Sequence, residues 1–585
     1  MTRRSGAGGG SNRPARGRRS AAGAHVDLRL AIPAAAGWTA TAAAIGIRGA
    51  AASSAGVAAT LAVVCAGIAV RSAVRARPRA TPTGSPHAGP RIPRRRRARR
   101  ADASAARCRR AAAALAVAGG VAAMLLGAAA AREPSRHPEV LEAAVHADGM
   151  VVADAVVDEP PAQVAARPGS GQGRADRVRI VAHLTALHIG RDAGGRTVDA
   201  TLRLPAPVPV VVFASGVDEQ HDGSAPARPG VGALMHVSAA VRAADPGDRA
   251  AYLLVARGAP EVAGGPAGAL GFADGLRARL ADAAADLRGP GAELLPGLAI
   301  GDVSAVTPAL AQTMKDSSLT HLTAVSGANC AVIVGLVLAL AAAAGLRRPA
   351  RAVAALAALG AFVILVTPQP SVLRAAVMAA VLIVSTASGR PSRGLPALAV
   401  AVVVLLTGDP WLARDLGFAL SVLATAGLLV LAPPLADRLS RRMPRRLAEA
   451  LAIPVAAQVA CQPVLLVLQP GLPVHGVLAN VLAEPAAAPA TIGGLVACVV
   501  LPVWPSAGGL VLRLAWLPAS WIAAVASVMS RLPAGRVPWA SGPAGVIALT
   551  VAIALVIAVV ALGRPVSPRP RAAAVPGPGD VPPDG

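Results

Sequence analysis

The sequence predicts a polytopic α-helical membrane protein with about 12 transmembrane helices and a small, β-rich extracytoplasmic domain. The first observation behind this prediction is composition: 54% of the 585 residues are hydrophobic, and the mean hydropathy is +0.55. The second is that runs of about 20 apolar residues, the length needed to cross a bilayer, recur along the chain. The third is an uneven distribution of the net charge of +26.

Charge predicts which segments lie on which side of the membrane. Residues 1–110 contain 22 arginines and two acidic residues, a net charge of +20, whereas residues 132–268 contain 13 arginines and 16 acidic residues, a net charge of −3. Basic segments stay in the cytoplasm. We therefore expect a disordered cytoplasmic arm over 1–29, a cytoplasmic loop over 71–110, and an external domain over 132–268 of a protein of the cytoplasmic membrane.

The apolar runs fix the expected crossings. Three lie in the N-terminal region 30–131, at 30–47, 50–70 and 111–131. Nine more are expected at 325–345, 352–367, 371–388, 395–407, 414–433, 449–468, 491–504, 509–530 and 544–562. Loops assigned to the cytoplasm then hold 13 arginines and those assigned outside hold two, as the positive-inside rule requires. Twelve crossings return the C-terminus to the cytoplasm, followed by a disordered tail over 563–585.

The external domain has strand-like sequence. Short β-branched runs are broken by Gly, Pro and Asp in "MVVADAVVDEP", "RVRIVAHLTALHI", "RTVDATLRLPAPVPVVVFASG", "ALMHVSAAVRAA" and "AAYLLVARG". Five or six strands with turn signals predict a small β-barrel or sandwich, and we expect an OB-like fold.

Residues 269–290 follow this domain and predict an amphipathic helix. One helical stripe is apolar and consists of Phe272, Leu276, Leu280 and Leu287. Charged residues, Arg277 among them, lie off that stripe. We therefore expect a helix that lies on the membrane surface.

One apolar stretch does not read as a simple crossing. "LPVHGVLANVLAEPAAAPATIGG" carries His475, Asn480, Glu484 and several prolines. Irregular backbone is tolerated at membrane depth only where protein covers it or it lines a cavity. We interpret the stretch as two half-helices that enter and leave the same membrane face.

Ionisable residues within the predicted spans mark candidate sites, because each costs roughly 2.5–3.5 kcal/mol to insert even on the lenient scale. Arg374 in "PSVLRAAVMAAV" and Asp415 in "ARDLGFALSVLATAGLLV" are the clearest. Two interpretations stay open for them. They either line a polar conduit, or they serve structure as an Arg–Asp pair that locks two helices or as side chains that reach the membrane interface.

No pattern in the sequence predicts catalysis. The five cysteines have no metal-type spacing, and we find no nucleophile–base pair and no phosphate-binding glycine loop. We therefore expect no enzymatic activity, no cofactor and no metal site.

Six segments carry a resemblance to a known family. They are "LLPGLAIGD", "SLTHLTAVSGANCAVIVG", "PSVLRAAVMAAV", "GDPWLARDLGFALSVLAT", "ACQPVLL" and "HGVLANVLAEPAAAPATI", in this order within 270–500. Together they resemble the competence-protein (ComEC) family of DNA-uptake channels. The resemblance implies that residues 291–562 form a membrane channel that imports one DNA strand during natural transformation. It also implies that the β-rich segment is the family's small external domain.

The chain departs from the family pattern in two respects. Asn329 stands where the family's central motif usually has His. The HxHxDH signature of the metallo-β-lactamase-like domain that ends many members is absent, so the chain resembles the form without that domain.

The resemblance implies a set of residues along the DNA path. These are His321, Thr323, Ser326, Gly327, Asn329, Arg374, Asp415, Gln462, Asn480 and Glu484. Neutral donors contact phosphate and base without gripping them, and Gly327 lets the backbone come close. The alternative is a helix-packing face, which uses the same small and polar residues.

The implied partners are single-stranded DNA, the lipid bilayer, a surface DNA receptor and a cytosolic DNA translocase; a homo-oligomer stays open. The basic arm either catches emerging DNA by counterion release or only fixes topology. A secondary transporter for a small solute is the competing function, but internal repeats expected for it are not found. A structural anchor for the β domain would not need polar residues in so many spans.

Overall fold

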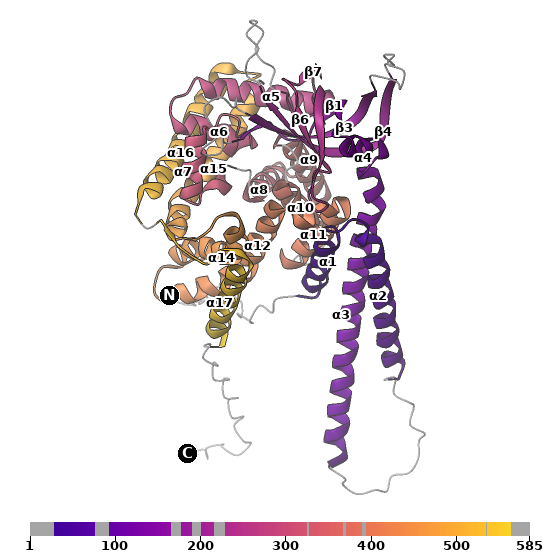
Figure 1. Ribbon diagram of the computed structural model, residues 1–585. Helices are drawn as coiled ribbons and strands as arrows, with labels where there is room; N and C mark the ends of the chain where they lie inside the picture. The colour runs from indigo at the N-terminus through magenta and orange to yellow at the C-terminus, as the bar shows by residue number, and fades with distance from the viewer. Residues whose placement is uncertain are drawn as a thin grey trace, which may run out of the picture.

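The computed structural model of the chain joins a β-barrel to a large helical bundle (Figure 1). It describes residues 28–75, 93–164, 177–189, 200–215, 229–323, 327–366, 370–388, 394–533 and 535–562. The predicted N-terminal arm and C-terminal tail lie almost entirely outside these residues. In Figure 1 the strands occupy one end of the molecule, and the paired helices α2 and α3 extend toward the other.

Three helices precede the barrel: α1 (Ala31–Ala44), α2 (Ala50–Arg75) and α3 (Pro93–Arg136). A Cβ added at Gly119 of α3 would lie 3.0 Å from the Cβ of Ala62 in α2, so small residues allow these helices to pack closely. The predicted loop over 71–110 is wrong in its bounds, because α2 continues to Arg75 and α3 begins at Pro93. Arginine and alanine are strong helix formers, and extending an existing apolar helix costs less than starting a new one.

The barrel confirms the predicted β-rich domain. Its strands are β1 (Met150–Val157), β2 (Ala162–Val164), β3 (Arg177–Ile189), β4 (Ala200–Ser215), β5 (Leu234–Ala243), β6 (Tyr252–Ala256) and β7 (Glu261–Gly264). Five strands form a closed ring in the order β1-β3-β4-β6-β5, because β1 also pairs with β5. The β4–β6 pairing is parallel and the other pairings are antiparallel.

Alternation of side chains fills the barrel. Residues of β1 alternate between buried and partly exposed, as expected for strands with one face in a core. Ile180, Leu184, Tyr252 and Leu254 are fully buried inside. The short helix α4 (Glu139–His146) precedes β1 and adds the buried Leu141 to the same core.

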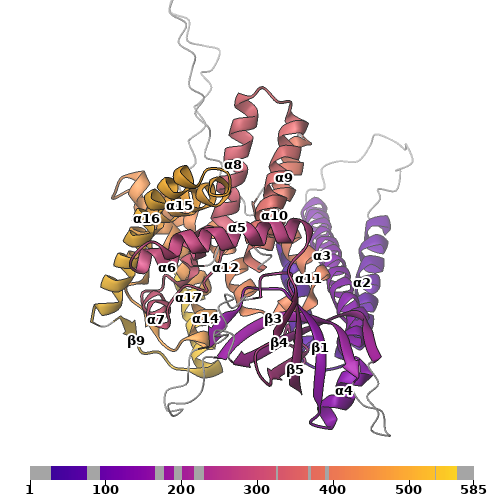
Figure 2. The same cartoon turned by 90° about the horizontal axis from the view of Figure 1, so that it is seen from above.

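The helix α5 (Gly268–Ala285) crosses the molecule beside the barrel (Figure 2). Its position corrects the predicted surface helix in two respects: Leu280 of the apolar stripe is fully buried in the core of the bundle, and Arg277 is only 6% exposed. Arg277 donates from Nε to the carbonyl oxygen of Leu365 at 2.8 Å and from Nη2 to that of Ile364 at 2.6 Å. These carbonyls lie at the end of α9 (Arg348–Val366), where a helix lacks internal partners and attracts cations.

The rest of the chain forms the helical bundle. Its elements are α6 (Pro290–Ile300), α7 (Pro308–Asp316), η1 (Thr320–Leu322), α8 (Gly327–Ala343), α9, α10 (Pro370–Ala387), α11 (Gly394–Gly408), η2 (Pro410–Arg414), α12 (Leu416–Val430), α13 (Ala432–Leu439), α14 (Arg445–Leu468), β8 (Leu472–Pro473), α15 (Gly476–Val500), α16 (Pro505–Arg531), β9 (Arg536–Val537) and α17 (Gly542–Leu562). The largest apolar core lies among α6, α15 and α16.

Helix length and composition indicate a polytopic membrane protein. Among the described residues, eight helices are long and apolar enough to cross a membrane, or nine if α12 and α13, bent by 44°, form one span. The predicted 12 crossings are therefore not reached by this criterion. α8 and α11 are apolar but shorter. Large apolar side chains on α17, such as Ile547 and Val559, are exposed, as expected for a surface that meets lipid.

The predicted pair of half-helices is wrong. Residues 476–500 form the single helix α15, which contains Pro485 and Pro489 and is long enough to span. Prolines are tolerated in such helices where neighbouring groups take over freed backbone polar atoms. Trp521 of α16 packs against this part of α15, and its indole Nε1 donates to the carbonyl oxygen of Leu482 at 2.9 Å.

Candidate functional site

Arg374 is a buried cation in the middle of the bundle. It lies on α10 and is 6% exposed. Its Nε donates to the hydroxyl of Ser421 at 2.9 Å, and its Nη1 donates to the hydroxyl of Thr425 at 2.8 Å. Both hydroxyls belong to α12, and Nη1 also lies 3.5 Å from the sulfur of Met378. Within the part of the chain that the structure describes, no carboxylate comes within ion-pair distance of Arg374.

These partners leave the charge of Arg374 uncompensated. Hydroxyl groups satisfy N–H donors, but they carry no negative charge, and a buried charge without a counter-ion is costly. Proteins keep such groups where an anion or a partner meets them in function. A guanidinium also matches the geometry of phosphate oxygens.

Gly327 brings the start of α8 against this guanidinium. A Cβ added at Gly327 would lie 3.3 Å from Nη2 of Arg374 and 3.2 Å from the Cβ of Ala375. Asn329 is half-buried in the same first turn. A helix N-terminus carries partial positive charge. The N-terminus of α8 and the guanidinium of Arg374 together therefore favour an anion over a cation. The structure thus brings together two predicted site residues, Gly327 and Arg374.

Asp415 does not join this cluster. Its Oδ1 accepts the backbone N–H of Phe418 at 2.6 Å, which makes it the N-cap of α12. Ser421 lies six residues further along α12, a distance of about 9 Å along the helix axis. The Arg–Asp pair considered as a structural alternative is therefore wrong, and Asp415 has a local structural contact instead.

Ser421 and Thr425 were missed by the sequence analysis. Hydroxyl side chains are common in apolar helices, where they usually bond the preceding turn. Their four-residue spacing, which puts both on one helix face, is a signal that was available. Their role as partners of Arg374 could be inferred only once α10 was known to pack against α12.

The segment before α8 contains the remaining predicted residues of the opening motif. His321 lies in η1 and is exposed, and Thr323 donates its hydroxyl to the carbonyl oxygen of Thr320 at 2.7 Å. Ser326 lies outside the described residues. No hydrogen bond joins described atoms of His321 or Thr323 to Arg374, so this motif meets the guanidinium through Gly327.

A second polar group joins α14 and α15. Gln462 is buried on α14, and its side-chain oxygen accepts from Nε2 of Gln458 at 2.5 Å. Gly476, at the start of α15, faces the same group, since an added Cβ would lie 3.6 Å from Oε1 of Gln458 and 3.2 Å from the hydroxyl of Ser318. Among described groups, Nε2 of Gln462 and Nδ1 of His475 are buried without a hydrogen-bond partner. Such unpaired donors are unusual in a packed interior.

Asn480 and Glu484 lie one turn apart on α15. The side-chain amide of Asn480 donates to the carbonyl oxygen of Gly476 at 2.7 Å, and Glu484 is exposed. The structure therefore relates Asn480 to the group around Gly476, whereas Glu484 makes no contact that gives it a role.

Comparison with known families finds a match for most of the helical bundle. The family model described as "Competence protein" matches residues 298–564. This segment, somewhat less than half of the chain, is similar to the competence-protein family. Both polar groups lie within this competence segment. Neither the characterised proteins nor the solved structures contain a significant match to the chain.

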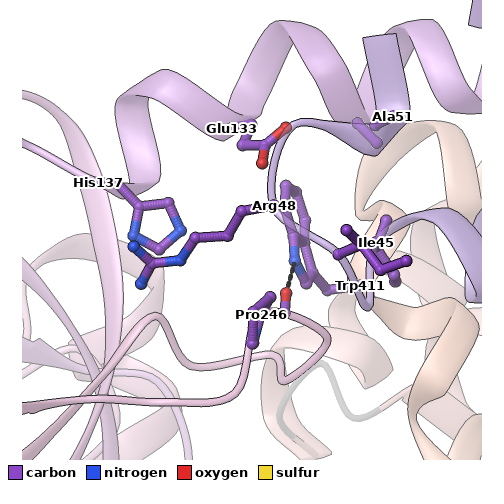
Figure 3. Close-up of a pocket in the computed structure, with 9 residues that line it drawn as sticks. Ile45, Arg48, Ala51, Glu133, His137, Pro246 and Trp411 are labelled. Carbon is purple, nitrogen blue, oxygen red and sulfur yellow. Dashed lines mark hydrogen bonds between the residues drawn. The ribbon is translucent and has the colours of Figure 1, made fainter. Parts of the chain in front are cut away.

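The barrel is docked onto the competence segment by a loop between β5 and β6. Trp411 of η2 donates from Nε1 to the carbonyl oxygen of Pro246 at 3.0 Å (Figure 3). Arg136, at the end of α3, lies 3.8 Å above the ring of Trp411 and donates to the carbonyl oxygens of Asp248 and Arg249. These contacts fix the barrel against both α3 and the competence segment.

A small pocket lies at this junction, lined by residues that include Arg48, Glu133, His137 and Trp411 (Figure 3). Its cavity measures only about 10 Å³, whereas small-molecule sites usually measure about 300–1,000 Å³. Arg48 extends across it toward His137 and lies 3.4 Å from Glu142. The pocket is an imperfectly filled domain junction and offers no binding site for a nucleotide.

Proposed function

We propose that the chain forms a membrane channel that carries single-stranded DNA across the cytoplasmic membrane in natural transformation. The match of residues 298–564 to the competence-protein family model connects the chain to DNA uptake. The observation that carries the finer proposal is Arg374, a buried cation held by hydroxyls and bordered by Gly327. A strand that carries one phosphate per nucleotide supplies the anion that this cation lacks.

The polar groups of the bundle suit a polymer that must keep moving. One fixed cation attracts phosphate, while neutral donors such as Asn329, Gln462 and Asn480 bind it or the bases only weakly. A dense cluster of arginines would instead hold the strand, because each phosphate contact adds affinity. The unpaired donor of Gln462 fits a path whose occupant is itself polar.

The barrel supports an OB-like DNA-binding role. The closed order β1-β3-β4-β6-β5 with one parallel pairing agrees with a five-stranded OB-like barrel, a fold that binds oligonucleotides across adjacent strands. Arg179 on β3 is exposed and is the register partner of the partly exposed Phe213 on β4. An aromatic ring beside an arginine on one face is the usual platform for stacking bases of a single strand.

The proposal includes the surroundings of the channel. The barrel lies outside the cytoplasmic membrane and both termini lie in the cytoplasm. A surface receptor delivers DNA, and a cytosolic translocase supplies the energy, since we assign no catalytic step to this chain. The docked junction at Trp411 would keep the barrel in line with the competence segment.

Complementation of a strain that lacks its channel tests the proposal. In a naturally transformable host that lacks its own channel, the chain should restore transfer of labelled DNA into a nuclease-protected compartment. DNA bound at the cell surface should not change, because the receptor is separate. If the chain changed only the amount of DNA bound at the surface, or had no effect, a channel role would be contradicted. A small-solute transporter would then be favoured.

A further inference from the structure

Two histidines and one aspartate converge on the outer face of the barrel. Oδ1 of Asp154 on β1 lies 2.7 Å from Nε2 of His188 on β3 and 2.5 Å from Nδ1 of His236 on β5. One donor atom from each residue lies within 4.8 Å of the other two. The exposed fractions of the side chains are 16% for Asp154, 34% for His188 and 42% for His236, so the cluster is accessible from outside.

Barrel closure creates the cluster. Asp154 is the direct register partner of His236 across the β1–β5 pairing, so their side chains stand on the same face. His188 is paired with Val152, two residues before Asp154 on the same face of β1. The three residues are separated by 34 and 48 positions in the chain, which is why spacing alone gave no metal motif.

The donors are held in place before any ligand binds. His188 presents Nε2 to Asp154 while its Nδ1 lies 3.3 Å from the hydroxyl of Thr201 on β4. A metal-binding histidine is usually oriented in this way by a partner on its second nitrogen. The rings of His188 and His236 meet edge to face, with centroids 5.7 Å apart. Burial raises the pKa of Asp154, but hydrogen bonds from both histidines outweigh it and hold that pKa below its ordinary value.

We propose that Asp154, His188 and His236 bind a divalent transition-metal ion of the Zn²⁺ class. Two imidazole nitrogens and one carboxylate oxygen are a donor set that zinc accepts, at about 2.0–2.2 Å from each atom. Donors at tetrahedral zinc lie about 3.3 Å from one another, so the nitrogens must each move roughly 0.6–0.9 Å away from the Asp154 oxygen to admit the ion. A fourth position stays open toward solvent for water.

Glu261 stands next to this open side. It is the register partner of His236 on β7, and it is exposed. Its carboxylate therefore shares the face of the cluster and is a second source of oxygen for the fourth position.

The ion would link the strands at which the ring closes. It would join β1 to β5 on one side and to β3 on the other, so it would bind the folded barrel and not the unfolded chain. Binding of this kind raises stability with metal concentration. The inference is independent of DNA transport, because it concerns only the barrel.

Metal titration of the purified full-length protein in detergent tests the proposal. The protein must carry no polyhistidine tag and be stripped with a chelator first. Added Co²⁺ should give visible absorption typical of nitrogen and oxygen ligands, reach one equivalent per chain, and be displaced by Zn²⁺. Zn²⁺ should also raise the temperature at which the barrel unfolds.

Three variants separate this site from adventitious binding. His188→Gln and His236→Gln should each weaken Co²⁺ binding by about 10–100-fold or more, as loss of a ligand or its support does. His183→Gln is the matched control: it lies on the same strand, its imidazole contacts Asp158 at 2.8 Å, and it should bind Co²⁺ normally. Absence of stoichiometric binding to the unmodified protein would overturn the proposal. The proposal would also be overturned if the His188→Gln and His236→Gln variants bound Co²⁺ as tightly as the unmodified protein does.

Discussion

Gly327 of α8 lies directly beside the guanidinium of Arg374 on α10, with only 3.3 Å between Nη2 and the position that a Cβ would take. The polar start of one apolar helix therefore meets the single buried cation of another. This contact explains why the segment "VSGANC" combines a small residue with polar ones inside an otherwise apolar run. Any side chain at position 327 must displace the guanidinium, Ala375 or both.

Substitution of Gly327 should separate passage from packing. Gly327→Ala adds a methyl at 3.2–3.3 Å from its neighbours, which a slight shift accommodates, so uptake should fall only modestly. Gly327→Leu should push Arg374 aside and abolish uptake, while insertion is unimpaired because leucine partitions well into membranes. Uptake of labelled DNA is measured beside protein abundance. Loss of uptake that merely follows loss of protein would favour the helix-packing interpretation.

Asp415 should matter for stability and not for passage. Asp415→Ala removes the N-cap of α12 and should cost about 1 kcal/mol of folding free energy. Asp415→Asn, which keeps a capping oxygen, should be close to the unmodified protein. Thermal unfolding in detergent measures both. If Asp415→Asn stops DNA uptake at normal abundance, its carboxylate acts in the path after all.

The sequence predicted the barrel well because strand signals are local. Alternating β-branched runs located β1, β3, β4, β5 and β6 almost to the residue. The same local approach failed for α15, where Pro485 and Pro489 suggested a break but a single helix continues from Gly476 to Val500. It also failed for α3, whose apolar half extends a helix into basic sequence.

The candidate site was only partly predictable. Arg374 was identified because a charge in an apolar span is conspicuous, but its partners Ser421 and Thr425 depend on which helix packs against α10. Asp415 was equally conspicuous, and its role as a cap is set by the kink between η2 and α12. The cluster of Asp154, His188 and His236 depends wholly on barrel closure.

Stability of the barrel should depend on pH through Glu142 and Tyr252. Burial raises the pKa of Glu142. The hydrogen bond from Tyr252 and the charge of Arg48 act in the opposite direction and outweigh burial, so the pKa of Glu142 lies below its ordinary value. A lowered pKa stabilises the fold above the unfolded-state value and loses that effect as pH falls. Tyr252→Phe should therefore destabilise the protein by about 1 kcal/mol near neutral pH.

That difference should shrink below about pH 4.3, the ordinary pKa of glutamate, because protonated Glu142 no longer profits from the donor. Unfolding temperatures of both proteins are compared near neutral pH and in acid. A difference that is the same at both would show that Tyr252 acts through packing alone.

Labelling should place the barrel outside the cell. Ala259 is exposed in the turn between β6 and β7, so Ala259→Cys should react with an impermeant thiol reagent in intact cells. Cys65 and Cys108, which are accessible, are replaced by serine in the parent protein, and this parent is the control. Reaction only after lysis would reverse the proposed topology.

The central claim is that Arg374 meets DNA and does not merely hold α10 to α12. The direct measurement is uptake of labelled DNA per molecule of channel in the Arg374→Gln variant, with Arg136→Gln as the control. Both arginines are buried, but the partners of Arg136 among the described residues are backbone carbonyls and the ring of Trp411. We predict normal abundance and lost uptake for Arg374→Gln, and uptake that follows abundance for Arg136→Gln. Normal uptake per molecule in Arg374→Gln would contradict the account.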